Sequence, residues 1–124
     1  MARAAMTAIW LALAACTSAG PAAPSGAGVC EASAAEAKRR VTSVVPANLA
    51  CESDADCQAV MVMSSCFNEC AAAMNLTGAG AVDRASTLVE AHECKVFADA
   101  GCAPPKRQCE AAGKPVCTGG QCRF

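Results

Sequence analysis

Aromatic side chains are almost absent from this sequence. They make up 3% of the 124 residues, with no Tyr, one Trp (Trp10) and three Phe (Phe67, Phe97 and Phe124). Proteins that hold single-stranded nucleic acid without sequence preference stack the bases on aromatic side chains. We therefore expect neither a stacking platform of that kind nor a large aromatic core.

Long runs of one charge are also missing. The formal net charge is −1, and the longest basic cluster is the tripeptide Lys38-Arg39-Arg40. A nucleic-acid-binding domain typically carries a basic patch and a high isoelectric point, so we predict no nucleic-acid partner. We interpret the tripeptide as the solvated face of a helix.

The usual catalytic and metal-binding motifs are missing as well. His92 is the only His, and the sequence contains neither Gly-x-Ser-x-Gly nor Cys-x-x-Cys. We therefore expect no catalytic residue, no metal and no cofactor, and hence a protein that is not an enzyme. Structural zinc stays open as an alternative, because the spacings Cys66/Cys70 and Cys117/Cys122 fit zinc ligands loosely.

The acidic tripeptide Asp54-Ala55-Asp56 resembles the start of a calcium-binding loop. An EF-hand loop needs Gly at its sixth position and Glu at its twelfth, and counting from Asp54 these positions hold Ala59 and Ser65. We therefore predict a turn whose carboxylates accept hydrogen bonds from nearby backbone N–H groups. An irregular calcium site stays open.

Large aliphatic side chains are few, whereas cysteines are many. Only 15 of the 95 residues from 30 to 124 are Leu, Ile, Val or Phe, which is a small core to set against a backbone entropy cost of roughly 1–2 kcal/mol per residue. Eleven cysteines are present. Disulfides that each contribute about 2–4 kcal/mol would supply the missing stability.

An even number of cysteines follows Cys16. We predict that these ten form five disulfides in an oxidising compartment, with a connectivity that the sequence leaves open. The residues are Cys30, Cys51, Cys57, Cys66, Cys70, Cys94, Cys102, Cys109, Cys117 and Cys122.

The N-terminal segment has the pattern of an export signal. Arg3 is followed by an apolar run from Ala4 to Ala15, which matches the charged start and apolar core of a secretory signal peptide. The run is shorter than the roughly 20 residues of a membrane-spanning helix. An ordinary signal peptidase would find an A-x-A-like site at Ala12-Leu13-Ala14.

A second cleavage site comes from a family resemblance. Leu13-Ala14-Ala15-Cys16 resembles the lipobox of bacterial lipoproteins. The segments Cys51-Glu-Ser-Asp-Ala-Asp-Cys57 and Cys117-Thr-Gly-Gly-Gln-Cys122 look like those of small cysteine-rich bacterial lipoproteins of unknown function. The resemblance implies cleavage before Cys16, lipid on the Cys16 thiol and anchoring in a membrane. Thr17, in place of Asp, implies the outer membrane or cell surface rather than the inner membrane.

The domain organisation follows from composition and periodicity. We predict a signal peptide over 1–15, a lipidated Cys16 with a Gly/Pro/Ser/Ala-rich linker over 16–29, and a disulfide-rich domain over 30–124. Apolar spacing predicts helices over 31–45 and 79–98, whereas the run 58–63 predicts a buried strand. Residues 71–76 fit either a short strand or the start of a helix.

The C-terminal part is predicted to be a loop followed by a hairpin. Residues 103–113 contain Pro104-Pro105 and would form the loop, and Gly119-Gly120 suits the two-residue turn of a hairpin over 114–124. That register places Cys117 opposite Cys122, so the two either bond to each other or both reach into the core.

These elements indicate an α+β fold: a small disulfide-rich domain with two helices packed on a short antiparallel sheet. We expect the sheet to combine the strand 58–63 with the C-terminal hairpin. We predict a membrane-tethered, non-catalytic lipoprotein of the cell envelope or surface that contacts another envelope protein. The alternatives are a disulfide-rich protease inhibitor or ligand-binding module, whose contact loop would include 103–108, and a metal- or redox-active cysteine domain.

Overall fold

The computed structural model describes residue 20 and residues 25–124. Cys16 and the leader lie outside this part of the chain. Along the described chain the elements are α1 (Gly26–Thr42), the 3₁₀ turns η1 (Pro46–Asn48) and η2 (Asp54–Asp56), β1 (Cys57–Met63), β2 (Asn68–Asn75), α2 (Gly78–Ala91), α3 (Glu93–Asp99), β3 (Val116–Thr118) and β4 (Gln121–Arg123). None of the helices in these residues is long and apolar enough to cross a membrane.

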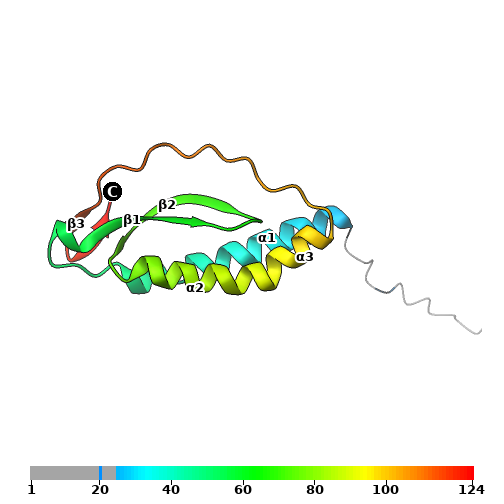
Figure 1. Ribbon diagram of the computed structural model, residues 1–124, viewed down its shortest axis with the longest axis horizontal. Coiled ribbons are helices and arrows are strands. Elements are labelled where there is room, and N and C mark those ends of the chain that lie inside the picture. Colours follow the sequence, from blue (N-terminus) through cyan, green and yellow to red (C-terminus); the bar gives the residue numbers. More distant parts are fainter. Residues whose placement is uncertain (1–19, 21–24) are drawn as a thin grey trace, which may run out of the picture.

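The elements form an elongated two-layer arrangement (Figure 1). The three α-helices lie together on one face of the β1–β2 sheet, and the β3–β4 hairpin lies at the end of that sheet where β1 begins. The segment that follows α3 runs back along the opposite face of the sheet to reach β3. The predicted α+β class with a C-terminal hairpin is therefore confirmed.

The expected composition of the sheet was wrong. β1 pairs with β2 in an antiparallel ladder, whereas β3 and β4 form a separate two-stranded sheet. The tight turn between β1 and β2, closed by a 2.9 Å bond from Ser64 N to Phe67 O, brings β2 to the edge of β1 with little loop-closure entropy. Pairing β1 with the distant hairpin would close a much longer loop. Residues 71–76, left open above, thus belong mostly to a strand.

The alternation of β1 defines the two faces of its sheet. Val60 and Val62 are buried against the helices, whereas Met61 and Met63 are 50% and 45% exposed on the other face. A bulge interrupts the register between Met61 and Met63. The inward face joins a core that spans both layers and contains Ala37, Val41, Val60, Val62, Cys66, Phe67, Met74, Val82, Val89, Cys94 and Phe97.

The first helix begins earlier than its predicted start. Gly26–Thr42 is helical, so residues 26–29, assigned above to the linker, extend the helix instead. A disulfide from Cys30 to Cys102 holds this end of α1 beside the end of α3. The helix stops before Pro46, as expected from the restriction that proline places on the residue before it.

The predicted helix over 79–98 is divided at His92, which has φ −121° and ψ −81°. In α2 the buried residues Val82 and Val89 are one heptad apart, and the next buried residue, Cys94, follows after five residues rather than three or four. The break at His92 allows Val89 on α2 and Cys94 on α3 both to face the core despite this irregular spacing. His92 and Val96, which three- and four-residue spacing from Val89 would place on its apolar stripe in one continuous helix, are exposed.

The hairpin turn agrees with its predicted chemistry, and a further glycine ends α3. Gly119 and Gly120 have φ of +60° and +73°, which is the left-handed region that a two-residue hairpin turn requires. Gly101, with φ +73°, ends α3, and its N–H donates to Ala98 O at 2.9 Å. Cys117 and Cys122 face each other in the hairpin ladder, as predicted.

Candidate functional site

All ten cysteines of the described chain are paired, as the sequence predicted. Each of the five bonds joins segments that are far apart along the chain, by 28 to 72 residues. The pairs are Cys30–Cys102, Cys51–Cys117, Cys57–Cys122, Cys66–Cys94 and Cys70–Cys109. Neither of the two possibilities left open for Cys117 and Cys122 holds in full: they do not bond to each other, and of the two only Cys122 is buried. Each instead crosses to the segment around η2.

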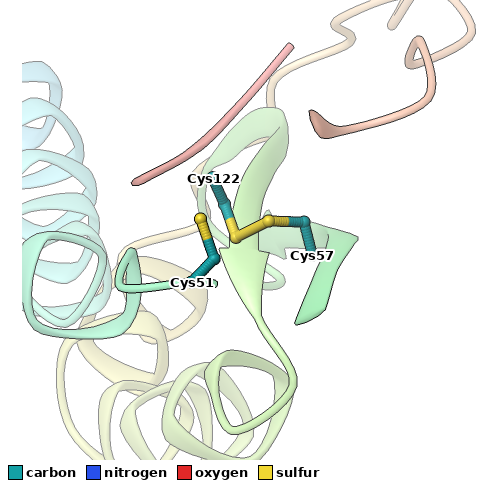
Figure 2. Close-up of side chains that lie close together, drawn as sticks. All are labelled: Cys51, Cys57 and Cys122. Carbon is teal, nitrogen blue, oxygen red and sulfur yellow. A yellow bond between two sulfur atoms is a disulfide. The ribbon is translucent and has the colours of Figure 1, made fainter. Parts of the chain in front are cut away.

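Three of these sulfurs form a compact group at the hairpin end of the molecule (Figure 2). The Sγ atoms of Cys51, Cys57 and Cys122 all lie within 4.8 Å of one another. Zinc binds thiolate sulfur, and here Cys57 is bonded to Cys122 and Cys51 to Cys117. In this oxidised state the group is therefore two neighbouring disulfides rather than a ligand set.

The segment from Cys51 to Cys57 is held by its carboxylates, as the turn interpretation predicted. Asp56 Oδ2 accepts hydrogen bonds at 2.8 Å from the backbone N–H groups of Glu52 and Ser53, which lowers the pKa of Asp56. Ser53 and Asp56 form a capping box around η2, a pairing that the three-residue spacing could have revealed.

Asp54 connects the same segment to the hairpin. Its Oδ1 accepts a 2.7 Å hydrogen bond from Cys117 N–H, while Cys51 N–H donates to Gly120 O at 3.1 Å and Cys122 N–H donates to Leu49 O at 2.7 Å. The carboxylates of Asp54 and Asp56 are thus used in shaping the turn and docking the hairpin.

The chain between Cys102 and β3 forms an exposed strap without helix or strand. Residues 103–114 are all exposed, and the strap is attached to β2 by Cys70–Cys109. Arg107 Nη1 lies 3.4 Å from Glu69 Oε1, which also accepts from Lys38 Nζ at 2.7 Å. A hollow of about 500 Å³ lies between the strap and the sheet, with Ala71 and Phe124 in its wall.

A second open groove, of about 560 Å³, runs between α1 and α3. Glu36 and Glu93 line it together with Ser33 and His92, but within the described chain no hydrogen bond joins Ser33 to His92. The sequence pattern does not predict that these residues meet, because Ser33 and Glu36 lie on α1 whereas His92 and Glu93 lie at the start of α3.

The two glutamates of this groove form ion pairs with arginine side chains of α1. Hydrogen bonds from Arg39, and then from Arg40, lower the pKa of Glu36 to about 2. Glu93 Oε1 lies 3.1 Å from Arg40 Nη1, whereas its Oε2 is buried and has no hydrogen-bond partner among the described residues. The side chains of Lys38-Arg39-Arg40 are thus largely engaged with carboxylates.

Comparisons with known proteins add no further candidate. No protein-family model, no curated protein and no solved structure matches this chain.

Proposed function

We propose that the protein is an exported lipoprotein, tethered to a membrane by lipid on Cys16, whose disulfide-rich domain has a non-catalytic role in contacting another envelope protein. The pairing of the cysteines carries this proposal. The five disulfides use all of the cysteines after Cys16 among themselves. Of the eleven cysteines in the sequence, these bonds leave out Cys16, the residue that this proposal acylates.

The number of disulfides supports export in the same way. Five disulfides in a small domain indicate an oxidising, extracellular environment, because cytosolic thiols are kept reduced. Two or more acyl chains give stable anchoring, since each buried CH₂ contributes roughly 0.8 kcal/mol. Ten residues separate Cys16 from the start of α1 at Gly26, counting Cys16 itself, and a chain of that length reaches at most about 36 Å. The domain would be held close to the membrane surface.

Metabolic labelling of the full chain in a bacterial host tests the anchor. With an alkyne analogue of palmitate, the wild-type chain should be labelled and should partition into the detergent phase. Cys16→Ala should lose both properties, whereas the adjacent control Thr17→Ala should retain them. A label that persists in Cys16→Ala, or an unlabelled wild-type chain cleaved after Ala14, would contradict the proposal.

The exposed methionines of β1 support the contact with a partner. Met61 and Met63 are exposed and alternate along β1 with the buried Val60 and Val62. Neighbouring exposed apolar side chains mark interaction sites more often than isolated ones do. In intact cells, a cross-linker should join the wild-type chain to a second protein, and the double variant Met61→Lys/Met63→Lys should lose this adduct. Leu88→Lys, on α2, is the control that should retain it. An adduct made only of two copies of this chain would refute a heterologous partner.

A disulfide-rich protease inhibitor is the second candidate, and the strap favours it. Lys106 is exposed and follows Pro104-Pro105 on a segment fixed at Cys102 and Cys109. An exposed Lys on an extended segment suits a trypsin-like protease. Residual trypsin activity should then fall stoichiometrically with added protein, and Lys106→Ala should abolish the effect while the control Lys114→Ala retains it. Full trypsin activity together with rapid cleavage after Lys106 would exclude this function.

The metal- or redox-active alternative has less support. It needs thiolates, and the ten cysteines of the described chain are bound in disulfides.

A further inference from the structure

Two disulfides join the same pair of segments at the hairpin end of the molecule. Cys51 and Cys57 flank the η2 turn, and their partners Cys117 and Cys122 flank the Gly119-Gly120 turn. Figure 2 places the sulfur of Cys51 beside the Cys57–Cys122 bridge, and these three sulfurs lie within 4.8 Å of one another. Among the residues that the structure describes, no other three cysteines gather in this way.

The same four cysteines have a second way to pair. Cys117 and Cys122 are directly opposite in an antiparallel ladder, where Cα atoms lie about 4.5–5.5 Å apart. This separation is within the roughly 4.4–6.8 Å that a disulfide spans. The sulfurs of Cys51 and Cys57 are already neighbours. Two local bonds, Cys51–Cys57 and Cys117–Cys122, would therefore join residues that are already neighbours in the fold.

We propose that this cluster is a thiol–disulfide exchange site, at which an external thiolate converts the two cross-links between η2 and the hairpin into two local disulfides. The inference goes beyond the proposed lipoprotein function and does not depend on it. Its co-reactant is a thiolate that attacks a disulfide sulfur and is later displaced, from a small thiol or from a cysteine of an exported oxidoreductase.

The exchange proceeds in three balanced steps through mixed disulfides. The external thiolate bonds to Cys117 Sγ, the Cys51–Cys117 bond breaks, and Cys51 leaves as a thiolate. Cys51 then attacks Cys57 Sγ, forms Cys51–Cys57 and releases Cys122 as a thiolate. Finally Cys122 attacks Cys117 Sγ, forms Cys117–Cys122 and expels the external thiolate. Two disulfides exist before and after, so no net oxidant or reductant is consumed.

The attacked residue, Cys117, is only partly buried, and so is Cys51, the residue that leaves as a thiolate. An open hollow of about 490 Å³ is lined by Cys51 and by the acidic residues Glu52 and Asp56. Exchange would remove both covalent links between the hairpin and the η2 segment, leaving the hydrogen bonds of Cys51, Cys117 and Cys122 described above to hold it. The hairpin would thereby change from a clamped element to one that is able to detach.

The first test uses the exported full-length chain carrying Cys16→Ala, so that the protein has no thiol of its own. It is incubated at mildly alkaline pH with substoichiometric reduced glutathione, or in a second arm with substoichiometric reduced thioredoxin. Exchange is then quenched with acid, and peptic peptides are mapped without reduction. The expected result is loss of the link between the peptides of 51–57 and 117–122, with an internal disulfide in each and an unchanged intact mass.

The two arms identify the source of the thiolate. Exchange in the glutathione arm assigns a small thiol, and exchange only in the thioredoxin arm assigns a protein partner. Unchanged connectivity in both arms, or net reduction without the local disulfides, overturns the proposal.

The second test places a thiol inside the cluster. In Cys117→Ser, again with Cys16→Ala, Cys51 becomes a thiol beside the Cys57–Cys122 bond, and a Cys51–Cys57 disulfide should appear without any added thiol. Cys109→Ser is the matched control: it creates a thiol on Cys70, which has no such neighbours, and that thiol should stay on Cys70. A thiol confined to Cys51 in folded Cys117→Ser overturns the proposal.

Discussion

At the scale of single residues, the carboxylate of Asp56 has the clearest energetic role. Its Oδ2 atom accepts hydrogen bonds from two backbone N–H groups and from the hydroxyl of Ser53, which lies 3.3 Å away. These hydrogen bonds stabilise the ionised form of the side chain. The pKa of Asp56 is therefore lowered from its ordinary value of 3.8, chiefly by the N–H of Glu52 and then by that of Ser53. The charge of one side chain thus sets the shape of the segment that carries Cys51 and Cys57.

Asp56→Asn should lower the melting temperature at neutral pH, because the amide is a weaker acceptor than the carboxylate for the two N–H groups. A carboxyl group with a lowered folded-state pKa contributes stability that is present above its unfolded pKa and is lost as the pH falls through the folded pKa. The difference between wild type and Asp56→Asn should therefore shrink as the pH is lowered from 3.8. Thermal melts followed by circular dichroism across this range measure it.

Asp83→Asn is the control for this series, since Asp83 is exposed on α2 and its substitution should leave the melting temperature nearly unchanged. A difference for Asp56→Asn that stays constant from neutral to acidic pH would show that its charge does not hold the turn.

At the scale of elements, close packing between α2 and β2 depends on a glycine. Gly78 is the first residue of α2 and is buried. A Cβ at this position would lie 2.6 Å from Met74 Cβ and 2.9 Å from Met74 Cε, and Met74 is itself fully buried. The helix therefore starts where it does because Gly78 lets its first turn approach the strand.

Gly78→Ala should destabilise the domain by about 1–3 kcal/mol, the usual cost of overpacking a core. Gly80, two residues later on the exposed side, is a matched comparison, because a Cβ there meets only the Nη1 atom of Arg84, at 3.4 Å. Gly80→Ala should be neutral or stabilising by up to about 1 kcal/mol, through the higher helix propensity of Ala. Denaturant unfolding of both variants measures the contrast, and equal effects would contradict this account of the packing.

At the scale of the whole molecule, disulfides replace what the core lacks. The core has few large side chains, and no strand of one small sheet pairs with a strand of the other among the described residues; the isolated bridge Ala50↔Gln121 joins β4 to the segment before Cys51. Four of the five bonds reach across 39 to 72 residues, and closing long loops restricts the unfolded chain most.

Full reduction and alkylation should therefore unfold the domain at room temperature, since each lost disulfide removes about 2–5 kcal/mol from a small exported domain. Circular dichroism should show loss of most helical signal and of the cooperative melt. A sample alkylated without reductant is the control and should melt like the untreated protein. A reduced chain that keeps a cooperative transition would show that apolar packing alone suffices.

The local chemistry of the chain was predictable from the sequence. The even set of cysteines indicated complete pairing, Gly119-Gly120 indicated the hairpin turn, Pro46 indicated a limit to the first helix, and Asp54 and Asp56 indicated a backbone-binding turn. The turn and helix-end predictions depend on residues that are close together in the sequence, and the pairing prediction depends on an even number of cysteines. Because the ten cysteines after Cys16 are an even set, Cys16 is the eleventh cysteine, and its lipidation stays a prediction.

Tertiary structure alone decided which distant segments meet. The partner of β1, the break at His92, the five pairings, and the neighbouring sulfurs of Cys51 and Cys122 all depend on how the helices and strands pack. Local propensity does not contain this information, because ten cysteines can be joined in many ways and the apolar face of a helix or strand does not indicate which element packs against it. Only the fold that buries Val89, Cys94 and Phe97 together selects one arrangement.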